Sequence, residues 1–176
     1  MEIVVGAVLT QNTAWVSVER ALANLRAARR LSYARLAATS EDQLAQHLKP
    51  SGYYNTKARR LKALLAFLRA RGGPRLARLT REDPSRLREA LLGVHGIGPE
   101  TADTILLYAA GVPVFVVDGY TRRIFSRHRL VPANAPYEIV QSAFMDALPR
   151  DPALLNEYHA LIVETAKRHC RTMPRC

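Results

Sequence analysis

The recurrence of apolar residues at helical spacing is the feature that most constrains how this chain folds. Across residues 55–71 the apolar positions include Leu61, Leu64, Leu65 and Leu68, and a Gly-Gly-Pro stop follows. Side chains three and four residues apart share one face of an α-helix, so this segment is predicted to be helical. The same spacing predicts helices over 99–110, 137–148 and 153–169, and shorter ones over 16–27, 40–47, 84–91 and 120–127.

Strand-like sequence is confined to Val114–Val117, between Pro113 and Asp118. A run this short fits a strand and a buried extended connection equally well. The chain as a whole is therefore predicted to be all-α. Residues 1–9 already form a helix-like apolar run, and the chain ends on a cysteine after a Pro-Arg pair. From these two ends we expect the natural protein to be longer.

Composition is that of a globular protein. The 176 residues are 48% hydrophobic, enough to build a core for one large domain or two small lobes. The sequence holds no run of about 18 apolar residues of the kind that crosses a membrane. Its start lacks the basic residues and the small-residue cleavage site of a signal peptide. The expected location is therefore the cytoplasm.

Positive charge is concentrated in one part of the sequence. The formal net charge is +11, and residues 51–90 carry eleven Lys or Arg against three Asp or Glu. Such a concentration favours a polyanionic partner, because basic side chains that neutralise phosphates release counterions. The alternative is a soluble protein that is simply rich in arginine. Composition alone favours nucleic acid only slightly.

A glycine-rich turn between two predicted helices is the sharpest local signal. It lies in the string LGVHGIGPETA over residues 92–102, with Gly96, Ile97 and Gly98 at the turn. Glycine tolerates positive φ and lets another backbone approach closely. Because the turn opens a helix, its free N–H groups suit an anion such as a DNA phosphate. A bare Gly-x-Gly would more simply be a link between helices.

The full string resembles the helix-hairpin-helix of the endonuclease III (HhH-GPD) superfamily of DNA glycosylases. In that family a Gly/Pro-rich loop and a catalytic aspartate follow the hairpin. Here Asp118 follows Glu100 by 18 residues, the spacing that the family uses. The likeness extends to residues 6–13, 51–61 and 159–170. It is greatest to the subgroup that includes the 3-methyladenine DNA glycosylases.

The resemblance implies an all-α fold of two helical lobes with a catalytic groove between them. Residues 12–111 would form the lobe that holds the hairpin (92–102), and residues 1–11 with 112–176 would form the second lobe. It also implies an enzyme that binds double-stranded DNA, turns one nucleotide out of the duplex and cuts the bond between base and sugar. We expect a monomer.

Asp118 precedes a predicted helix and, taken alone, is best explained as the N-cap of that helix. The two roles are compatible, because a helix N-terminus favours the ionised carboxylate. Departure of a base builds positive charge on the sugar. A nearby carboxylate stabilises that charge and orients or deprotonates a water nucleophile. With the family motif in place, Asp118 is predicted to be the catalytic residue.

Glu100 departs from the pattern of the bifunctional family members, which carry a lysine at this position. That lysine forms a Schiff base with the sugar and leads to strand cleavage. Glutamate forms no imine, so the sequence predicts a monofunctional glycosylase that leaves an intact abasic site. Glu100 is expected to contact the extruded base, or to be only an acidic residue favoured by the helix dipole.

Further residues are predicted to contact DNA. In the family a glutamine matching Gln11 enters the gap left by the flipped base and offsets part of the cost of extrusion. Gln11 and its neighbour could also form a turn with a helix cap. The predicted DNA-binding residues are Gln11, Asn12, Lys57, Gly96, Ile97, Gly98, Thr101 and Arg122. Trp15, Tyr53 and Tyr54 are candidates for base stacking, although lining of the core or the groove is the commoner role.

The two cysteines, Cys170 and Cys176, lie at the end of the chain. The iron–sulfur members of the family end with four cysteines, and these two match the first pair. A four-iron cluster needs four protein ligands. Either the ligand set continues beyond this chain or the cluster has been lost. Because the sequence has no other cysteine, we expect a four-iron four-sulfur cluster in the full-length protein, with Cys170 and Cys176 as metal ligands.

Three rival functions stand beside the monofunctional glycosylase. A bifunctional glycosylase/lyase is opposed by Glu100. A non-catalytic DNA-binding module is opposed by Asp118, which a phosphate clamp does not need, and a catalytically inactive relative is the third. The base is not fixed by sequence. The subgroup likeness and Glu100 favour alkylated purines over oxidised pyrimidines, uracil or thymine opposite guanine.

Overall fold

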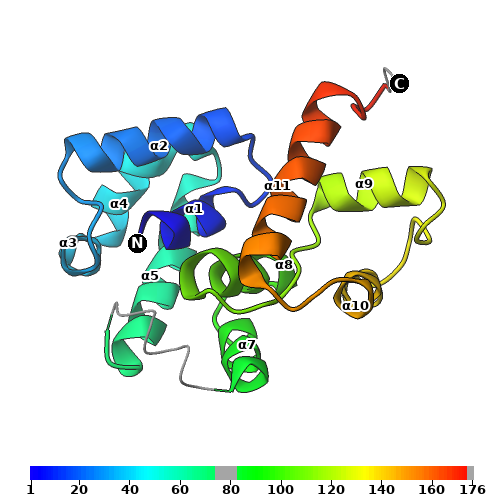
Figure 1. Ribbon diagram of the computed structural model, residues 1–176. Helices are drawn as coiled ribbons and strands as arrows, with labels where there is room; N and C mark the ends of the chain where they lie inside the picture. The colour runs from blue at the N-terminus through cyan, green and yellow to red at the C-terminus, as the bar shows by residue number, and fades with distance from the viewer. Residues whose placement is uncertain (74–82, 174–176) are drawn as a thin grey trace. The chain divides into compact units, whose positions relative to one another are not determined.

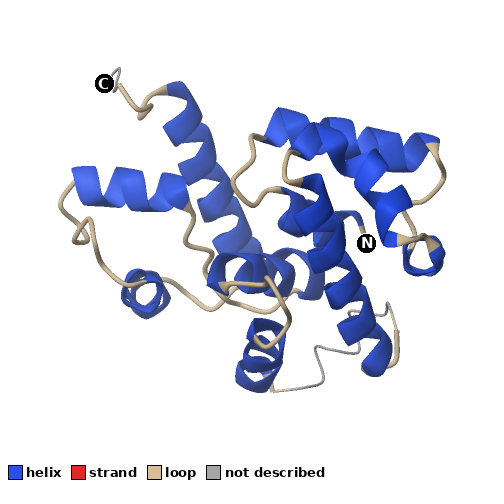
Figure 2. Cartoon of the chain, turned by 180° about the vertical axis from the view of Figure 1, so that it is seen from behind, coloured by secondary structure: helices blue, strands red, loops and turns tan. Residues whose placement is uncertain are grey.

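The computed structural model describes residues 1–73 and 83–173 (Figure 1). The described residues form helices and loops and contain no strand (Figure 2). This confirms the all-α prediction. The chain divides into two compact units, Met1–Ile105 and Leu106–Cys176, here called the first and second units.

The first unit holds most of the helices. Along the chain they are α1 (Glu2–Leu9), α2 (Trp15–Ala27), α3 (Tyr33–Ala38), α4 (Glu41–Leu48), the 3-10 turn η1 (Lys49–Ser51), α5 (Tyr54–Ala70), α7 (Pro84–Leu92) and α8 (Pro99–Thr104). Helix α4 packs against both α2 and α5, and α1 packs against α2, α5 and α8. Leu25, Leu44, Leu48, Leu61 and Leu64 are buried in this unit. The leucine spacing that predicted the helix over 55–71 thus marks the buried face of α5.

The second unit is built around aromatic rings. Its helices are α9 (Gly119–Arg127), α10 (Tyr137–Ala147) and α11 (Pro152–Arg168), with α9 packed on α11. Phe115 stacks on Phe144 with ring centroids 3.9 Å apart, and Phe125 meets Phe144 edge-on at 4.5 Å. Offset and edge-to-face pairs of this kind contribute beyond their buried area. These rings anchor the connection that leads to Asp118.

Residues 114–117 are an extended connection and not a strand. Val116 and Val117 are buried in the aromatic core of the second unit, so their apolar character reflects burial. Gln141 on α10 donates a hydrogen bond to the Phe115 carbonyl at 2.6 Å. This side chain thus provides a hydrogen-bond partner for a backbone carbonyl that a neighbouring strand would satisfy in a sheet. The buried extended connection was one of the two alternatives that the sequence left open.

The helix expected over 99–110 is divided. Helix α8 ends at Thr104, and a π-helical turn, η2 (Ile105–Ala109), follows it. The Thr104 hydroxyl donates to the Glu100 carbonyl at 2.7 Å, an intrahelical bond of the type that bends helices. The other predicted helices are confirmed within one or two residues, whereas α3 and η1 were not predicted.

The division into lobes proposed from sequence differs from the division into units. Helix α1 belongs to the first unit by its contacts, whereas residues 1–11 were assigned to the second lobe. The lobe assignment stays a prediction. None of the helices in the described part of the chain is long and apolar enough to cross a membrane.

Candidate active site

Asp118 caps the N-terminus of α9. Its backbone is extended, at φ −99° and ψ −178°. One carboxylate oxygen, Oδ1, accepts hydrogen bonds from the Thr121 backbone N–H at 2.7 Å and from the Thr121 hydroxyl at 2.9 Å. The capping role expected from sequence is therefore present. It fixes one oxygen of the carboxylate and leaves the other, Oδ2, for a different partner.

That partner is His159 on α11. Its Nε2 lies 3.5 Å from Asp118 Oδ2, an ion-pair distance when the imidazole is protonated and longer than an ordinary hydrogen bond. Its other ring nitrogen, Nδ1, lies 2.6 Å from the hydroxyl of Tyr108 on η2. Tyr108, His159 and Asp118 thus form a continuous polar chain inside the second unit. Only Asp118 was singled out as a catalytic residue by the sequence.

The surroundings of Asp118 favour its ionised form. Burial raises the pKa of the carboxyl, but the imidazole of His159 that faces it and the two hydrogen bonds of Thr121 outweigh burial and hold the pKa below its ordinary value. Burial, assisted by the negative charge of Asp118, raises the pKa of Tyr108 to about 12. At neutral pH Tyr108, at one end of this polar chain, is therefore a neutral phenol, and Asp118, at the other end, is an ionised carboxylate.

This carboxylate retains limited access to solvent. Asp118 keeps 14% of its side chain exposed, so it is largely desolvated but still reachable. A fixed negative charge in a poorly hydrated site stabilises positive charge more strongly than one in water. Such a group suits a reaction that develops a cation beside it and needs an acceptor for a proton of water.

The hairpin lies in the first unit. Helix α7 ends at Leu92, α8 begins at Pro99, and Gly96 between them has φ +78°. A Cβ atom on Gly96 would also overlap the side chain of Arg60 on α5. Gly98 is extended, and a Cβ there would meet open space. Only Gly96 is therefore required by the fold of the turn, and Ile97 is buried beside it.

Gln11 is tied to this hairpin. Its amide nitrogen donates to the Gly96 carbonyl at 3.0 Å and to the Thr101 hydroxyl at 2.9 Å, and its oxygen accepts from Arg60 Nη1 at 2.6 Å. The structure thus brings together three residues predicted to bind DNA, together with Arg60, which sequence reasoning missed. Entry of Gln11 into a duplex would require release of these bonds, and that role stays a prediction.

The remaining predicted contacts have varied surroundings. Asn12 is exposed with φ +52°, and Tyr53 is exposed with φ +45°. Exposed Trp15 donates to Glu19 at 2.9 Å, whereas Tyr54 is partly buried. Glu100 is exposed in the first turn of α8. These residues are accessible to a ligand, and their roles stay predictions.

Lys57 does not fit its predicted contact with the DNA backbone. Its residue is only 1% exposed, and its ammonium donates to the Leu9 carbonyl, the Ser51 carbonyl and the Thr13 hydroxyl at 2.8, 2.7 and 2.5 Å. Burial and the charge of Arg60 lower the pKa of Lys57 to about 8. The three donors of the ammonium are occupied by the protein, so Lys57 joins the loops around α1 and α5.

Arg122 and Arg123 follow Asp118 in the sequence but hold the second unit together. Arg122 donates to the Ala135 carbonyl at 2.6 Å. Arg123 donates to the carbonyls of Cys170 and Ala166 on the α11 side at 2.7 and 3.3 Å. A guanidinium has five donors, so a phosphate contact of Arg122 stays a prediction.

The cysteines do not provide a complete cluster site. Cys170 is buried, with its thiol 3.1 Å from Arg127 Nη1, and Cys176 lies outside the described residues. No group of three or more metal-ligating side chains occurs in the part of the chain that the structure describes. A four-iron cluster needs four ligands, and this chain offers two cysteines, so a cluster in the full-length protein stays a prediction.

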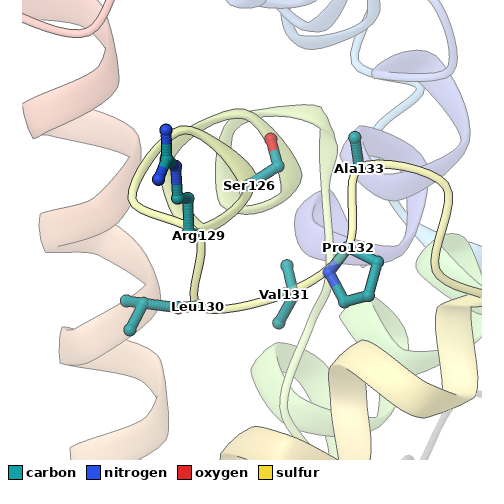
Figure 3. Close-up of a pocket in the computed structure, with 6 residues that line it drawn as sticks. All are labelled: Ser126, Arg129, Leu130, Val131, Pro132 and Ala133. Carbon is teal, nitrogen blue, oxygen red and sulfur yellow. The ribbon is translucent and has the colours of Figure 1, made fainter.

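A pocket of about 370 Å³ in the second unit lies away from Asp118. It is lined by residues 126 and 129–133, at the C-terminal end of α9 (Figure 3). Asp118 caps the opposite end of this nine-residue helix, about 13 Å away at 1.5 Å per residue. The pocket has no acidic or imidazole side chain in its lining, so it is not the candidate active site.

Comparisons with known proteins show the family of this chain. The family model for the HhH-GPD superfamily base excision DNA repair protein matches residues 5–150. A candidate DNA repair glycosylase of Methanocaldococcus jannaschii is 44% identical over 99% of this chain and 80% of its own length. Endonuclease III of Thermotoga maritima is 30% identical over 99% of this chain and 76% of its own.

A solved structure is also similar. The H. pylori 3-methyladenine DNA glycosylase, bound to 1,N6-ethenoadenine, superposes with a TM-score of 0.82 at 32% identity, over 95% of this chain and 84% of that one. The family match over residues 5–150 covers the segments that carry Gln11, the hairpin and Asp118. The chain therefore belongs to the HhH-GPD superfamily of base excision DNA repair proteins, as one of its DNA glycosylases.

Proposed function

We propose that this protein is a monofunctional DNA glycosylase in which Asp118 drives hydrolysis of the bond between a damaged base and its sugar. The observation that carries the proposal is the state of Asp118. It is largely buried, it has a lowered pKa, and Thr121 and His159 hold its two oxygens. A carboxylate kept ionised in a poorly hydrated site suits a cationic transition state.

In the proposed reaction the base leaves as positive charge grows on the sugar, and Asp118 stabilises that charge. A water molecule attacks the sugar carbon and gives up a proton, for which the carboxylate is a suitable acceptor. Glu100 supports the hydrolytic course, because a carboxylate in place of the lysine of bifunctional relatives forms no Schiff base. The product is then an abasic site in an unbroken strand.

Double-stranded DNA is the proposed partner. The net charge of +11 and the hairpin of the first unit support this, since the turn presents the start of α8 to an anion. Gln11, held by that turn, is proposed to fill the space of the extruded nucleotide. Alkylated or otherwise modified purines are the proposed bases. Support comes from the similar H. pylori enzyme, which is named for 3-methyladenine and holds 1,N6-ethenoadenine.

The test is base release from duplexes that each contain one modified or mispaired base. The bases are 3-methyladenine, 1,N6-ethenoadenine, thymine glycol, uracil, and thymine opposite guanine. Asp118→Asn is compared with Asp151→Asn, because Asp151 also caps a helix through its side chain, at the start of α11. Asparagine preserves capping in both variants. We expect wild type and Asp151→Asn to release a purine, and Asp118→Asn to be slower by about 10²–10⁴-fold.

Strand breaks are assayed with and without hot alkali. Breaks that need alkali support the monofunctional reaction, whereas breaks without alkali contradict it. Equal losses in the two aspartate variants would contradict the catalytic role of Asp118. Binding of every duplex without release of any base would favour a DNA-binding protein without catalysis.

A further inference from the structure

A buried polar chain leads from Asp118 into the second unit. Tyr108 on η2 contacts His159 on α11, and His159 faces the carboxylate that caps α9. The three side chains come from three different elements, so no local capping or turn motif accounts for their meeting. We propose that Tyr108 and His159 are positioning residues that keep Asp118 ionised and aimed during base excision. The proposal rests on the glycosylase function proposed above.

The Tyr108 hydroxyl bears on which ring nitrogen of His159 carries the proton. A neutral imidazole has one N–H and one acceptor nitrogen. When the phenol donates to Nδ1 across 2.6 Å, Nε2 must carry the hydrogen that points toward Asp118 Oδ2. The opposite tautomer would place the Nε2 lone pair against a negative oxygen. A protonated imidazole donates from both nitrogens, so Nε2–H faces Asp118 in that state too.

Packing holds the imidazole in this orientation. His159 is buried, and its ring meets Phe115 edge-on, with centroids 6.1 Å apart and planes at 83°. The Tyr108 ring also lies edge-on, at 5.9 Å and 70°. Nε2 is buried and makes no closer hydrogen bond within the described residues. A buried polar atom left without a close partner has a free-energy cost, and here that atom points at the candidate catalytic carboxylate.

The carboxylate is held from both sides as a result. Thr121 donates twice to Oδ1, and His159 faces Oδ2. At 3.5 Å the second contact is long, as catalytic hydrogen bonds often are in structures without substrate. Thr121 belongs to the cap, whereas His159 is the partner that can carry charge.

Other charged and titratable groups around this site have different partners. On α9, Arg122 donates to the Ala135 carbonyl, and Arg123 donates to carbonyls near the end of α11. On α10, the Tyr137 hydroxyl accepts a hydrogen bond from the Val117 N–H at 3.3 Å. Tyr120 lies beneath the Arg123 guanidinium. Among these groups of the described second unit, His159 is the titratable side chain that contacts Asp118 directly.

The first measurement is the titration of Asp118 by carbon NMR of its side-chain carboxyl, in protein without DNA. The signal is assigned by its loss in Asp118→Asn. Tyr108→Phe removes only the hydroxyl, and His159→Gln removes the group that can become a cation. Tyr158→Phe is the matched control, because Tyr158 adjoins His159 on α11 and its ring contacts Phe115 and Phe144. We expect an upward shift of the Asp118 titration in Tyr108→Phe and His159→Gln, and none in Tyr158→Phe.

The second measurement is the pH profile of single-turnover base release. The acidic limb should move to higher pH in Tyr108→Phe and His159→Gln, and the His159→Gln rate at neutral pH should fall about 10-fold or more. A merely structural role would lower the rate evenly across pH without moving the limb. An Asp118 titration in Tyr108→Phe that superposes on that of wild type would overturn the inference. Absence of base release by wild type, with the NMR shifts present, would refute the proposed function and leave the polar chain established.

Discussion

Arg88 and Asp103 join the two helices of the hairpin by a bidentate ion pair. Arg88 Nε on α7 lies 2.7 Å from Asp103 Oδ1 on α8, and Nη2 lies 3.0 Å from Oδ2. Asp103 is fully buried, whereas 22% of the Arg88 side chain is exposed. Paired contacts of this geometry fix orientation as well as distance. The pair therefore constrains the angle between α7 and α8, the helices on either side of the turn.

Asp103→Asn should lower the free energy of unfolding by about 2–4 kcal/mol, somewhat less than for a fully buried pair because Arg88 is partly exposed. The control is Glu41→Gln, which breaks the exposed pair of Glu41 with Arg59 at 3.6 Å, and should cost less than about 1 kcal/mol. Urea denaturation measures both. Equal losses in the two variants would show that the buried pair does not stabilise the hairpin.

The two turn glycines should respond differently to alanine. Gly96→Ala combines positive φ with overlap against Arg60, and should cost about 1–3 kcal/mol. Gly98→Ala adds a methyl to open space on extended backbone, and its stability should stay within about 0.5 kcal/mol of wild type. The same methyl should weaken duplex binding if phosphate approaches this turn closely. Unchanged binding by Gly98→Ala would argue that DNA does not contact the turn.

Lys57→Met tests the buried ammonium. The substitution keeps an unbranched side chain but removes the donor to the carbonyls of Leu9 and Ser51. Unpaired buried acceptors should lower the free energy of unfolding by about 2–4 kcal/mol. Arg59→Met, on an exposed face of the same helix, should change it by about 0.5 kcal/mol or less. A Lys57→Met protein of normal stability that binds DNA poorly would restore the original prediction for this residue.

The sequence predicted those features that depend on neighbours along the chain. Helix α5 follows from the spacing of its leucines and from the glycines that end it, and the cap at Asp118 follows from its place before an amphipathic segment. Both of these signals lie within about twenty residues, where local geometry determines the outcome. The catalytic role of Asp118 came instead from the resemblance to the HhH-GPD family, and it stays a prediction.

Features that depend on distant partners were missed or misassigned. Lys57 looked like one more charge in a basic segment, because its acceptor on Leu9 is 48 residues away. Tyr108 and His159 are 51 residues apart, and nothing local distinguishes His159 from the other four histidines. Arg60 likewise acquires its role only when α5 packs beside Gly96. A sequence of this length does not specify such pairs without the packing of the helices.

The lowered pKa of Asp118 predicts a dependence of stability on pH. Its folded pKa lies below the unfolded value of about 3.9, so ionised Asp118 stabilises the fold above that value, and the contribution is lost as pH falls through the folded pKa. Asp118→Asn should therefore be less stable than wild type at pH 7, and the difference should shrink below about pH 4. Urea titrations at several pH values measure this, with Asp151→Asn as the baseline for losing a cap charge. A difference that is constant with pH would contradict the ionised pairing.

Glu100 provides the sharpest test of the reaction course. Bifunctional relatives form a Schiff base with a lysine at the matching position, and borohydride reduces this intermediate to a stable adduct. Wild type should give no trapped adduct with a duplex that it acts on, whereas Glu100→Lys should give one and should break the strand without alkali. Glu89→Lys makes the same charge change at an exposed position of α7, and this variant should bind DNA at least as well as wild type without forming an adduct. Trapping by wild type would show that another amine attacks the sugar. Equal trapping by the two lysine variants would show that added charge, and not the position of residue 100, is responsible.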